Sequence, residues 1–122
     1  MSKRILVADD SDAIRGVVHT YLAKRDFDVC GEAADGEDAI KKAQELKPDL
    51  ILLDVAMPRK NGIEAASVLK GTMPNVPIIL FTMYGEAVGR TFPREQLAVD
   101  AVIAKAEGME RLEQCVQRLL RT

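Results

Sequence analysis

The sequence predicts an α/β protein with a doubly wound parallel sheet of five strands. The clearest sign is the run at residues 50–53, which is entirely apolar and lies between Pro48 and Pro58. Runs without polar alternation are typical of strands buried on both faces, as in the middle of a parallel sheet. Similar runs recur along the chain and alternate with segments of helical periodicity, which favours helices on both faces of the sheet.

The first strand covers residues 4–8, and the helix after it has Ser11 or Asp12 as its N-cap. This helix ends at residues 24–26. Apolar residues recur in it at steps of three and four, which predicts one buried stripe. The stripe consists of Ile14, Val17, Val18, Tyr21 and Leu22. Residues 27–33 alternate more loosely, so we expect a second, more exposed strand there.

Two further helices flank the central strand. One begins after Asp35, a capping residue, and carries acidic residues in its first turn, where the helix dipole favours them. The other begins after Asn61, with Glu64 in the position of a capping box, and Gly71 is expected to end it. A fourth buried strand then covers residues 77–81.

The segment from residue 85 to residue 100 is the least regular part of the chain. Gly89 and Pro93 interrupt it, so we expect a fourth helix that is short or broken. The last strand covers residues 101–104, and an amphipathic helix at residues 109–120 follows it. The order is thus a strand and a helix repeated five times.

Right-handed crossovers leave few topologies for such an order, and the flavodoxin-like strand order 2-1-3-4-5 is the most direct one. The length of 122 residues fits a single domain that spans residues 1–122. In such a sheet the carboxyl ends of all strands meet at one edge, where ligands bind. We therefore expect functional residues directly after the strands.

Composition and charge argue against several other classes of protein. The formal net charge of −2 gives no electrostatic reason for direct binding to nucleic acid. The apolar runs are far shorter than a membrane span, and the N-terminus lacks the apolar core of a signal peptide. Two cysteines, Cys30 and Cys115, are too few for a disulfide framework, which favours reduced thiols. These features predict a cytoplasmic protein that does not contact a membrane.

Polar residues follow four of the five predicted strands. Asp9 and Asp10 come after the first strand, Asp54 after the third, Thr82 after the fourth and Lys105 after the fifth. Each has an ordinary explanation when taken alone: the acids as helix caps, Thr82 as a β-former and Lys105 as a solvated loop residue. The predicted topology brings all of them to one edge of the sheet, which favours a common functional site.

The chemistry of this group indicates phosphoryl transfer. Three carboxylates at one point repel one another, and a hard divalent cation such as Mg²⁺ relieves that repulsion. A carboxylate beside such a cation can act as a nucleophile, and Asp54, in the middle of the edge, is the predicted phosphoryl acceptor. The hydroxyl of Thr82 and the ammonium of Lys105 would contact the oxygens of the transferred group.

Four motifs follow one another along the chain: ILVADD at residues 5–10, LLDVAMPRKNG at residues 52–62, FT at residues 81–82, and Lys105. In this order and spacing they resemble the receiver domain of bacterial two-component response regulators. The resemblance implies that a sensor histidine kinase or a phosphotransfer protein phosphorylates Asp54. It also implies that the chain then switches conformation to control an output partner or domain, whose identity the sequence does not give.

The resemblance further implies a ligand set for Mg²⁺. Asp10, Asp54 and the backbone carbonyl of Ala56 would hold the ion directly, and Asp9 would bind through water. Because the ligand at residue 56 is a backbone carbonyl, the apolar side chain there is no obstacle.

Three residues depart from the usual pattern of that family. Val102 occupies a position that generally carries an aromatic residue, Ala106 stands in place of a common proline, and Met83 in place of a small residue. Tyr84 is our candidate for the missing aromatic switch residue. The other interpretation, which the sequence leaves open, is that Tyr84 is a loop residue that shields the phosphate site.

The sequence leaves two alternative functions. One is a small phosphohydrolase that forms a transient aspartyl phosphate. Enzymes of the haloacid-dehalogenase type place a second aspartate two residues after the nucleophile, and this chain has Ala56 there. The other is a receiver-like interaction module that accepts no phosphate, and the complete set of predicted site residues argues against it. We therefore expect a signalling switch and not an enzyme.

Overall fold

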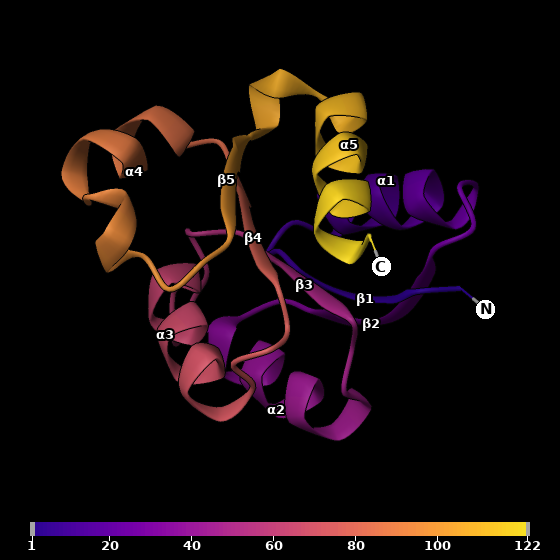
Figure 1. Ribbon diagram of the computed structural model, residues 1–122, viewed down its shortest axis with the longest axis horizontal. Coiled ribbons are helices and arrows are strands. Elements are labelled where there is room, and N and C mark those ends of the chain that lie inside the picture. The colour runs from indigo at the N-terminus through magenta and orange to yellow at the C-terminus, as the bar shows by residue number, and fades with distance from the viewer. Residues whose placement is uncertain (1, 122) are drawn as a thin grey trace.

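The structure is a computed structural model that describes residues 2–121. Its centre is a sheet of five parallel strands in the order β2-β1-β3-β4-β5 (Figure 1). The strands are β1 (Arg4–Ala8), β2 (Asp28–Ala33), β3 (Leu50–Leu53), β4 (Ile78–Thr82) and β5 (Ala101–Ala104). The predicted flavodoxin-like fold and its strand order are confirmed.

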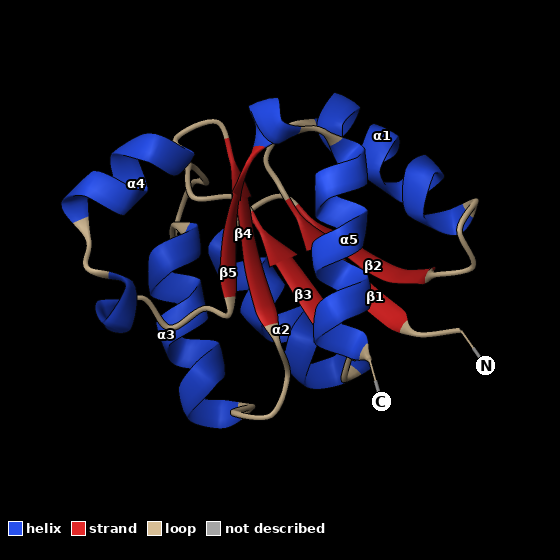
Figure 2. Ribbon diagram, turned by 45° about the horizontal axis from the view of Figure 1, so that its top comes forward, coloured by secondary structure: helices blue, strands red, loops and turns tan. Residues whose placement is uncertain are grey.

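Among the described residues, five α-helices cover the two faces of this sheet. They are α1 (Asp12–Ala23), α2 (Gly36–Leu46), α3 (Gly62–Thr72), α4 (Gly85–Thr91) and α5 (Met109–Leu120). Helices α1 and α5 lie on one face and α2 and α3 on the other, and α4 stands beside β5 (Figure 1 and Figure 2). Buried apolar side chains form one core on each face, so the central strand β3 is buried on both sides.

Local capping explains where the helices begin. The side chains of Ser11 and Asp35 each accept a hydrogen bond from the backbone N–H three residues further on, at 3.2 and 2.8 Å. At the start of α3, the side chains of Asn61 and Glu64 each accept a hydrogen bond from the backbone N–H of the other residue, at 2.9 and 3.2 Å. These caps satisfy free N–H groups at the first turns and turn the chain directly from a strand end into a helix.

One residue of the expected apolar stripe in α1 is not buried. Val17 is 55% exposed, whereas Val18 and Leu22 are buried. Successive residues of a helix are about 100° apart, so Val17 lies to one side of the line formed by Ile14, Val18 and Leu22. The prediction that Val17 faces the core was wrong.

Two glycines that were expected to end or interrupt helices lie inside them. Helix α3 continues through Gly71 to Thr72, and α4 includes Gly89, because a glycine weakens a helix without necessarily ending it. The expectation of a short or broken fourth helix is confirmed. Helix α4 has seven residues, and a 3₁₀ turn at Arg94–Gln96 follows Pro93.

Two further sequence features can be followed in the structure. Among residues 2–121, no helix combines the length and the apolar character that crossing a membrane requires. Cys115 is buried and Cys30 is partly buried, and both are free thiols.

Candidate functional site

The polar residues that follow the strands meet at one edge of the sheet. Parallel pairing places the carboxyl ends of β1, β3, β4 and β5 side by side (Figure 2). A pocket of about 470 Å³ opens at this edge. Its lining includes Asp9, Asp10, Asp54, Ala56 and Lys105. The structure therefore brings together residues that are far apart in the sequence and that sequence reasoning had selected.

The carboxylates of Asp9, Asp10 and Asp54 form the centre of the site. Each offers an oxygen, and these oxygens all lie within 4.8 Å of one another. Asp9 and Asp54 are 3% and 6% exposed, whereas Asp10 is exposed. Burial and the negative charge of Asp9 raise the pKa of Asp54. The ammonium of Lys105 and the hydroxyl of Thr82 oppose this rise in pKa without cancelling it.

Lys105 places a positive charge directly against two of these carboxylates. Its Nζ lies 2.7 Å from Asp9 Oδ2 and 3.3 Å from Asp54 Oδ2. Burial lowers the pKa of Lys105, but the hydrogen bond to Asp9 and the charges of both carboxylates raise it above its usual value. Lys105 therefore stays charged and balances one of the three carboxylates.

The remaining donors fit a Mg²⁺ ion. Three carboxylates and one ammonium leave two negative charges, which a divalent cation would balance. Ala56 lines the same pocket and offers a backbone carbonyl oxygen. Carboxylate, carbonyl and water oxygens are the ligands that Mg²⁺ prefers, so the chemistry of the donor set suits this metal.

The loop after β3 is folded back on the end of that strand. Met57 is buried, and the N–H groups of Met57 and Gly62 both donate to the carbonyl of Val55, at 3.1 and 3.0 Å. A Cβ at Gly62 would lie 2.0 Å from the carbonyl oxygen of Asp54, so only a glycine allows this close approach. The loop is thus fixed at the point where it presents Asp54 and Ala56 to the pocket.

An ion pair fastens the same loop to α2. Arg59 has a positive φ of 66°, and its Nε and Nη2 atoms each lie 2.9 Å from Asp35 Oδ2. The hydrogen bond from the backbone N–H of Asp38, and then the one from Arg59, hold the pKa of Asp35 below its usual value. A Cβ at Gly36 would lie 1.9 Å from the carbonyl oxygen of Lys60, so the loop and α2 are in close contact.

Thr82 and Tyr84 connect the site to α4. Thr82 is fully buried at the end of β4, and its Oγ1 accepts a hydrogen bond from the backbone N–H of Tyr84 at 3.2 Å. Tyr84 is 52% exposed and lines the acidic pocket together with Met83, which is 74% exposed. This position suits the interpretation of Tyr84 as a shield of the site, and its role as a switch residue stays a prediction.

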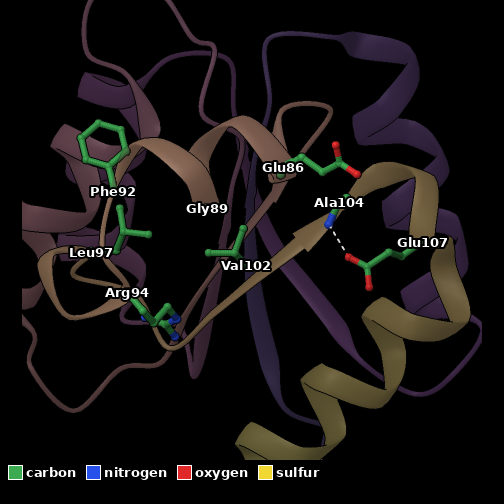
Figure 3. A pocket seen from close by; sticks show the side chains of 9 residues that line it. Glu86, Gly89, Phe92, Arg94, Leu97, Val102, Ala104 and Glu107 are labelled. Carbon is green, nitrogen blue, oxygen red and sulfur yellow. Dashed lines mark hydrogen bonds between the residues drawn. The ribbon is translucent and has the colours of Figure 1, made fainter.

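A second pocket, of about 300 Å³, lies between α4 and β5. Figure 3 shows the Val102 side chain pointing from β5 toward the part of α4 that carries Gly89. Gly85 and Ala104 also line this pocket. An added Cβ at Gly89 would meet no atom within 4 Å, so the space between this part of α4 and β5 is unfilled.

Sequence reasoning missed the arginines that support the site. Arg15 donates to the backbone carbonyl of Asp9 at 2.6 Å, and Arg59 binds Asp35. The one local signal for Arg15 is its spacing of three residues from Asp12, which allows an ion pair within a helix. Arg59 and Asp35 are 24 residues apart, so no local pattern marks their contact.

Known proteins with similar sequences are response regulators. A family model for the response regulator receiver domain matches residues 5–117. The response regulator protein VraR from Staphylococcus saprophyticus is 34% identical over 119 residues, which make up 97% of this chain but only 56% of VraR. The chemotaxis protein CheY from Thermotoga maritima is 37% identical over 86 residues, which make up 70% of this chain and 72% of CheY.

Solved structures share the fold over almost the whole chain. The response regulator domain of CheB from Thermotoga maritima matches with a TM-score of 0.86 and 28% identity, over 100% of this chain and 98% of that one. The response regulator protein TrrA from the same organism, in complex with Mg²⁺-BeF, has a TM-score of 0.86 and 31% identity, over 97% of this chain and 99% of that one. By its fold, its edge of clustered acids and these matches, the chain belongs to the response regulator receiver domain family.

Proposed function

We propose that this chain is a phospho-accepting switch and that Asp54 is the residue that becomes phosphorylated. The observation that carries the proposal is the cluster of Asp9, Asp10 and Asp54 at one edge of the sheet, with Lys105 beside it. Asp54 lies at the end of the central strand, and its Oδ2 faces the ammonium of Lys105 across 3.3 Å.

The acceptor step requires an ionised Asp54. One of its carboxylate oxygens attacks the phosphorus of a phosphohistidine on the donor protein. An O–P bond forms, the N–P bond breaks, and the histidine nitrogen keeps the electron pair of that bond. The backbone N–H of Val55 binds Asp54 Oδ1 at 2.8 Å and orients the carboxylate. Lys105 and Thr82 bind the oxygens of the transferred group.

Mg²⁺ would neutralise the negative charge that gathers between the acids and the phosphoryl group. Asp10, Asp54 and the backbone carbonyl of Ala56 would hold the ion directly. Asp9 would bind through water, since its Oδ2 is already 2.7 Å from Lys105. The complex of TrrA with Mg²⁺-BeF, from a relative with 31% identity, supports this choice of metal.

The partners follow from the family that the chain belongs to. The phosphoryl donor is a sensor histidine kinase or a phosphotransfer protein in the cytoplasm, and the output lies in a partner protein or another domain. We assign no contact with nucleic acid or membrane to this chain. We treat residues 1–122 as one receiver domain, although residues 1 and 122 at its ends lie outside the described residues.

We propose that the chain is a switch and not an enzyme that turns over a substrate. The residue two positions after Asp54 is Ala56, which has no carboxylate to act as a general acid or base on the phosphoryl group. Loss of the phosphoryl group to water then resets the switch.

Incubation with Mg²⁺ and acetyl phosphate tests the proposal. Intact-mass measurement should show one added phosphoryl group, stable in acid and labile to base and hydroxylamine. Asp54→Asn should abolish it. The control is Asp26→Asn, since Asp26 is exposed and has a φ of 67°, a conformation that asparagine tolerates well. Labelling of Asp54→Asn at the level of the parent chain would contradict the assignment.

A further inference from the structure

Arg15 lies in α1, and its side chain is only 14% exposed. A guanidinium stays charged in a protein, so burying it costs free energy unless its donors are matched by acceptors. Arg15 also lies close to the acidic cluster, because it binds the backbone carbonyl of Asp9.

Three acceptors surround the guanidinium of Arg15. Its Nη1 donates to the backbone carbonyl of Asp9 at 2.6 Å, its Nε donates to Glu32 Oε1 at 3.2 Å, and its Nη2 binds Asp12. These acceptors come from the end of β1, from β2 and from α1. Because the guanidinium is planar, three simultaneous contacts fix both its place and its orientation.

The carbonyl that Arg15 binds belongs to the peptide between Asp9 and Asp10. The N–H of Asp9 donates to the carbonyl of Ala33 at 3.0 Å, and Asp9 Oδ1 accepts a hydrogen bond from the N–H of Ser11 at 2.9 Å. Asp9 is therefore fixed through both its backbone and its side chain. Asp10 is exposed, so the direction of its carboxylate depends on the peptide that Arg15 holds.

Glu32 anchors Arg15 from β2. One oxygen of Glu32 binds Arg15, and the other lies 2.7 Å from Nδ1 of His19. The hydrogen bond with His19, and then the one with Arg15, outweigh the effect of burial and lower the pKa of Glu32. Glu32 therefore stays ionised at neutral pH and keeps Arg15 in place.

We propose that Arg15 is a positioning residue for the metal site, which fixes the Asp9–Asp10 peptide so that the carboxylate of Asp10 stays close to that of Asp54. This inference rests on the proposed Mg²⁺ site, and it assigns a role to a residue that is not one of the ligands.

The direction in which Mg²⁺ affinity changes when Arg15 is removed separates a positioning role from a purely electrostatic one. Arg15 puts a positive charge near acids that bind a cation, so by Coulomb's law its removal alone would tighten Mg²⁺ binding. A positioning role predicts the opposite. Without Arg15 the peptide is free to turn, and Mg²⁺ affinity falls by about tenfold or more, as it does for other groups that orient metal ligands.

Calorimetric titration with Mg²⁺ alone, at constant ionic strength, tests the inference. Arg15→Ala should bind Mg²⁺ about tenfold more weakly than the parent chain. Arg15→Lys keeps the charge but lacks the planar set of donors, so it should also bind more weakly. Arg25→Ala is the matched control, because Arg25 lies just beyond the other end of α1, where its Nε is 3.0 Å from Glu113. This control should keep the parental affinity.

Thermal unfolding of each variant shows whether it is folded at the temperature of the titration. Folded Arg15 variants with parental or tighter affinity would overturn the inference, and the proposed site would stand. If Arg15→Ala does not fold, the Mg²⁺ affinity of Arg15→Lys alone tests the inference, and parental or tighter affinity would again overturn it. A parent chain that fails to bind Mg²⁺ would instead contradict the proposed function itself.

Discussion

The loops after β1 and β3 are held by the guanidinium groups of Arg15 and Arg59, whereas the short helix α4 borders an open pocket beside β5. Residues 9–11 and 54–61, which we name the clamped loops, are fastened by Arg15 and Arg59. Residues 83–100, which we name the α4 segment, contain a helix of seven residues. A pocket of about 300 Å³ lies between part of that helix and β5 (Figure 3).

This difference matches the two tasks of a phosphorylated switch. The proposed metal ligands must keep their positions, so the loops that carry them gain from ion pairs and close backbone contact. A segment that responds to phosphorylation must be able to move, and a short helix beside unfilled space opens locally at a lower cost than a close-packed one. Thr82 ends β4 at the site, and its Oγ1 accepts a hydrogen bond from the N–H of Tyr84, so it connects the site to the α4 segment.

The largest effect on stability is expected where α2 meets the loop after β3. Gly36→Ala would place a Cβ 1.9 Å from the carbonyl oxygen of Lys60, a backbone atom that cannot move without moving the loop. We expect a loss of about 3 kcal/mol in the free energy of unfolding, at the upper end of overpacking effects. Urea unfolding of the two proteins measures this loss. Unchanged stability would show that the loop is not clamped there.

A phenylalanine should be tolerated differently in the close-packed core of the sheet and beside the pocket that α4 borders. Val7→Phe adds a ring to a position that is 3% exposed in a close-packed core, and should cost about 1–3 kcal/mol. Val102→Phe adds the ring beside the pocket between α4 and β5, where we expect a change of less than about 1 kcal/mol. Equal losses in urea unfolding would argue that the space beside Val102 is not available.

Low pH should weaken the ion pair between Asp35 and Arg59. The pKa of Asp35 is lowered in the folded chain, so its ionised form stabilises the fold at pH values above the unfolded-state pKa of about 3.9. This stabilisation is lost as the pH falls through the lower folded-state pKa. Asp35→Asn keeps a good N-cap but removes the charge that binds Arg59.

Urea unfolding across this pH range measures the effect. The difference in unfolding free energy between the parent chain and Asp35→Asn should be largest near neutral pH and should shrink below about pH 4. The difference in unfolding free energy between the parent chain and Arg59→Ala should shrink over the same pH range. A difference that stays constant down to the lowest pH would mean that the charge of Asp35 does not stabilise the loop.

The smallest effect is a gain in stability within the α4 segment. At Gly89 an added Cβ meets no atom within 4 Å, in contrast to Gly36. Gly89→Ala should therefore stabilise the chain by about 0.5–1 kcal/mol, because alanine loses less backbone entropy in a helix. A higher midpoint of urea unfolding is the expected result, and a lower one would contradict the open packing of α4.

Much of the fold and the grouping of site residues follow from patterns that are visible in the sequence. Unbroken apolar runs mark buried strands, and the handedness of crossovers then determines which strands are neighbours. These two rules are enough to bring Asp9, Asp54 and Lys105 to the same edge. Local capping also marks the start of three helices, since each cap and its partner are three residues apart.

The missed features depend mainly on contacts between segments that are far apart in the sequence. Arg15 binds Glu32, 17 residues further on, and Arg59 binds Asp35, 24 residues before it. Such pairs form only after the strands and helices have packed. Val17 has the spacing of a buried residue, and its exposure depends on how α1 lies against the sheet.

Amide hydrogen exchange with and without Mg²⁺ and beryllofluoride tests the central claim most directly. The claim is that occupation of Asp54 is transmitted to the α4 segment while the clamped loops keep their structure. Exchange rates in residues 83–100 should change, although these residues hold none of the proposed metal ligands, and Asp54→Asn should abolish that change. A response confined to residues 9–11 and 54–61, with the α4 segment unaffected, would contradict the claim.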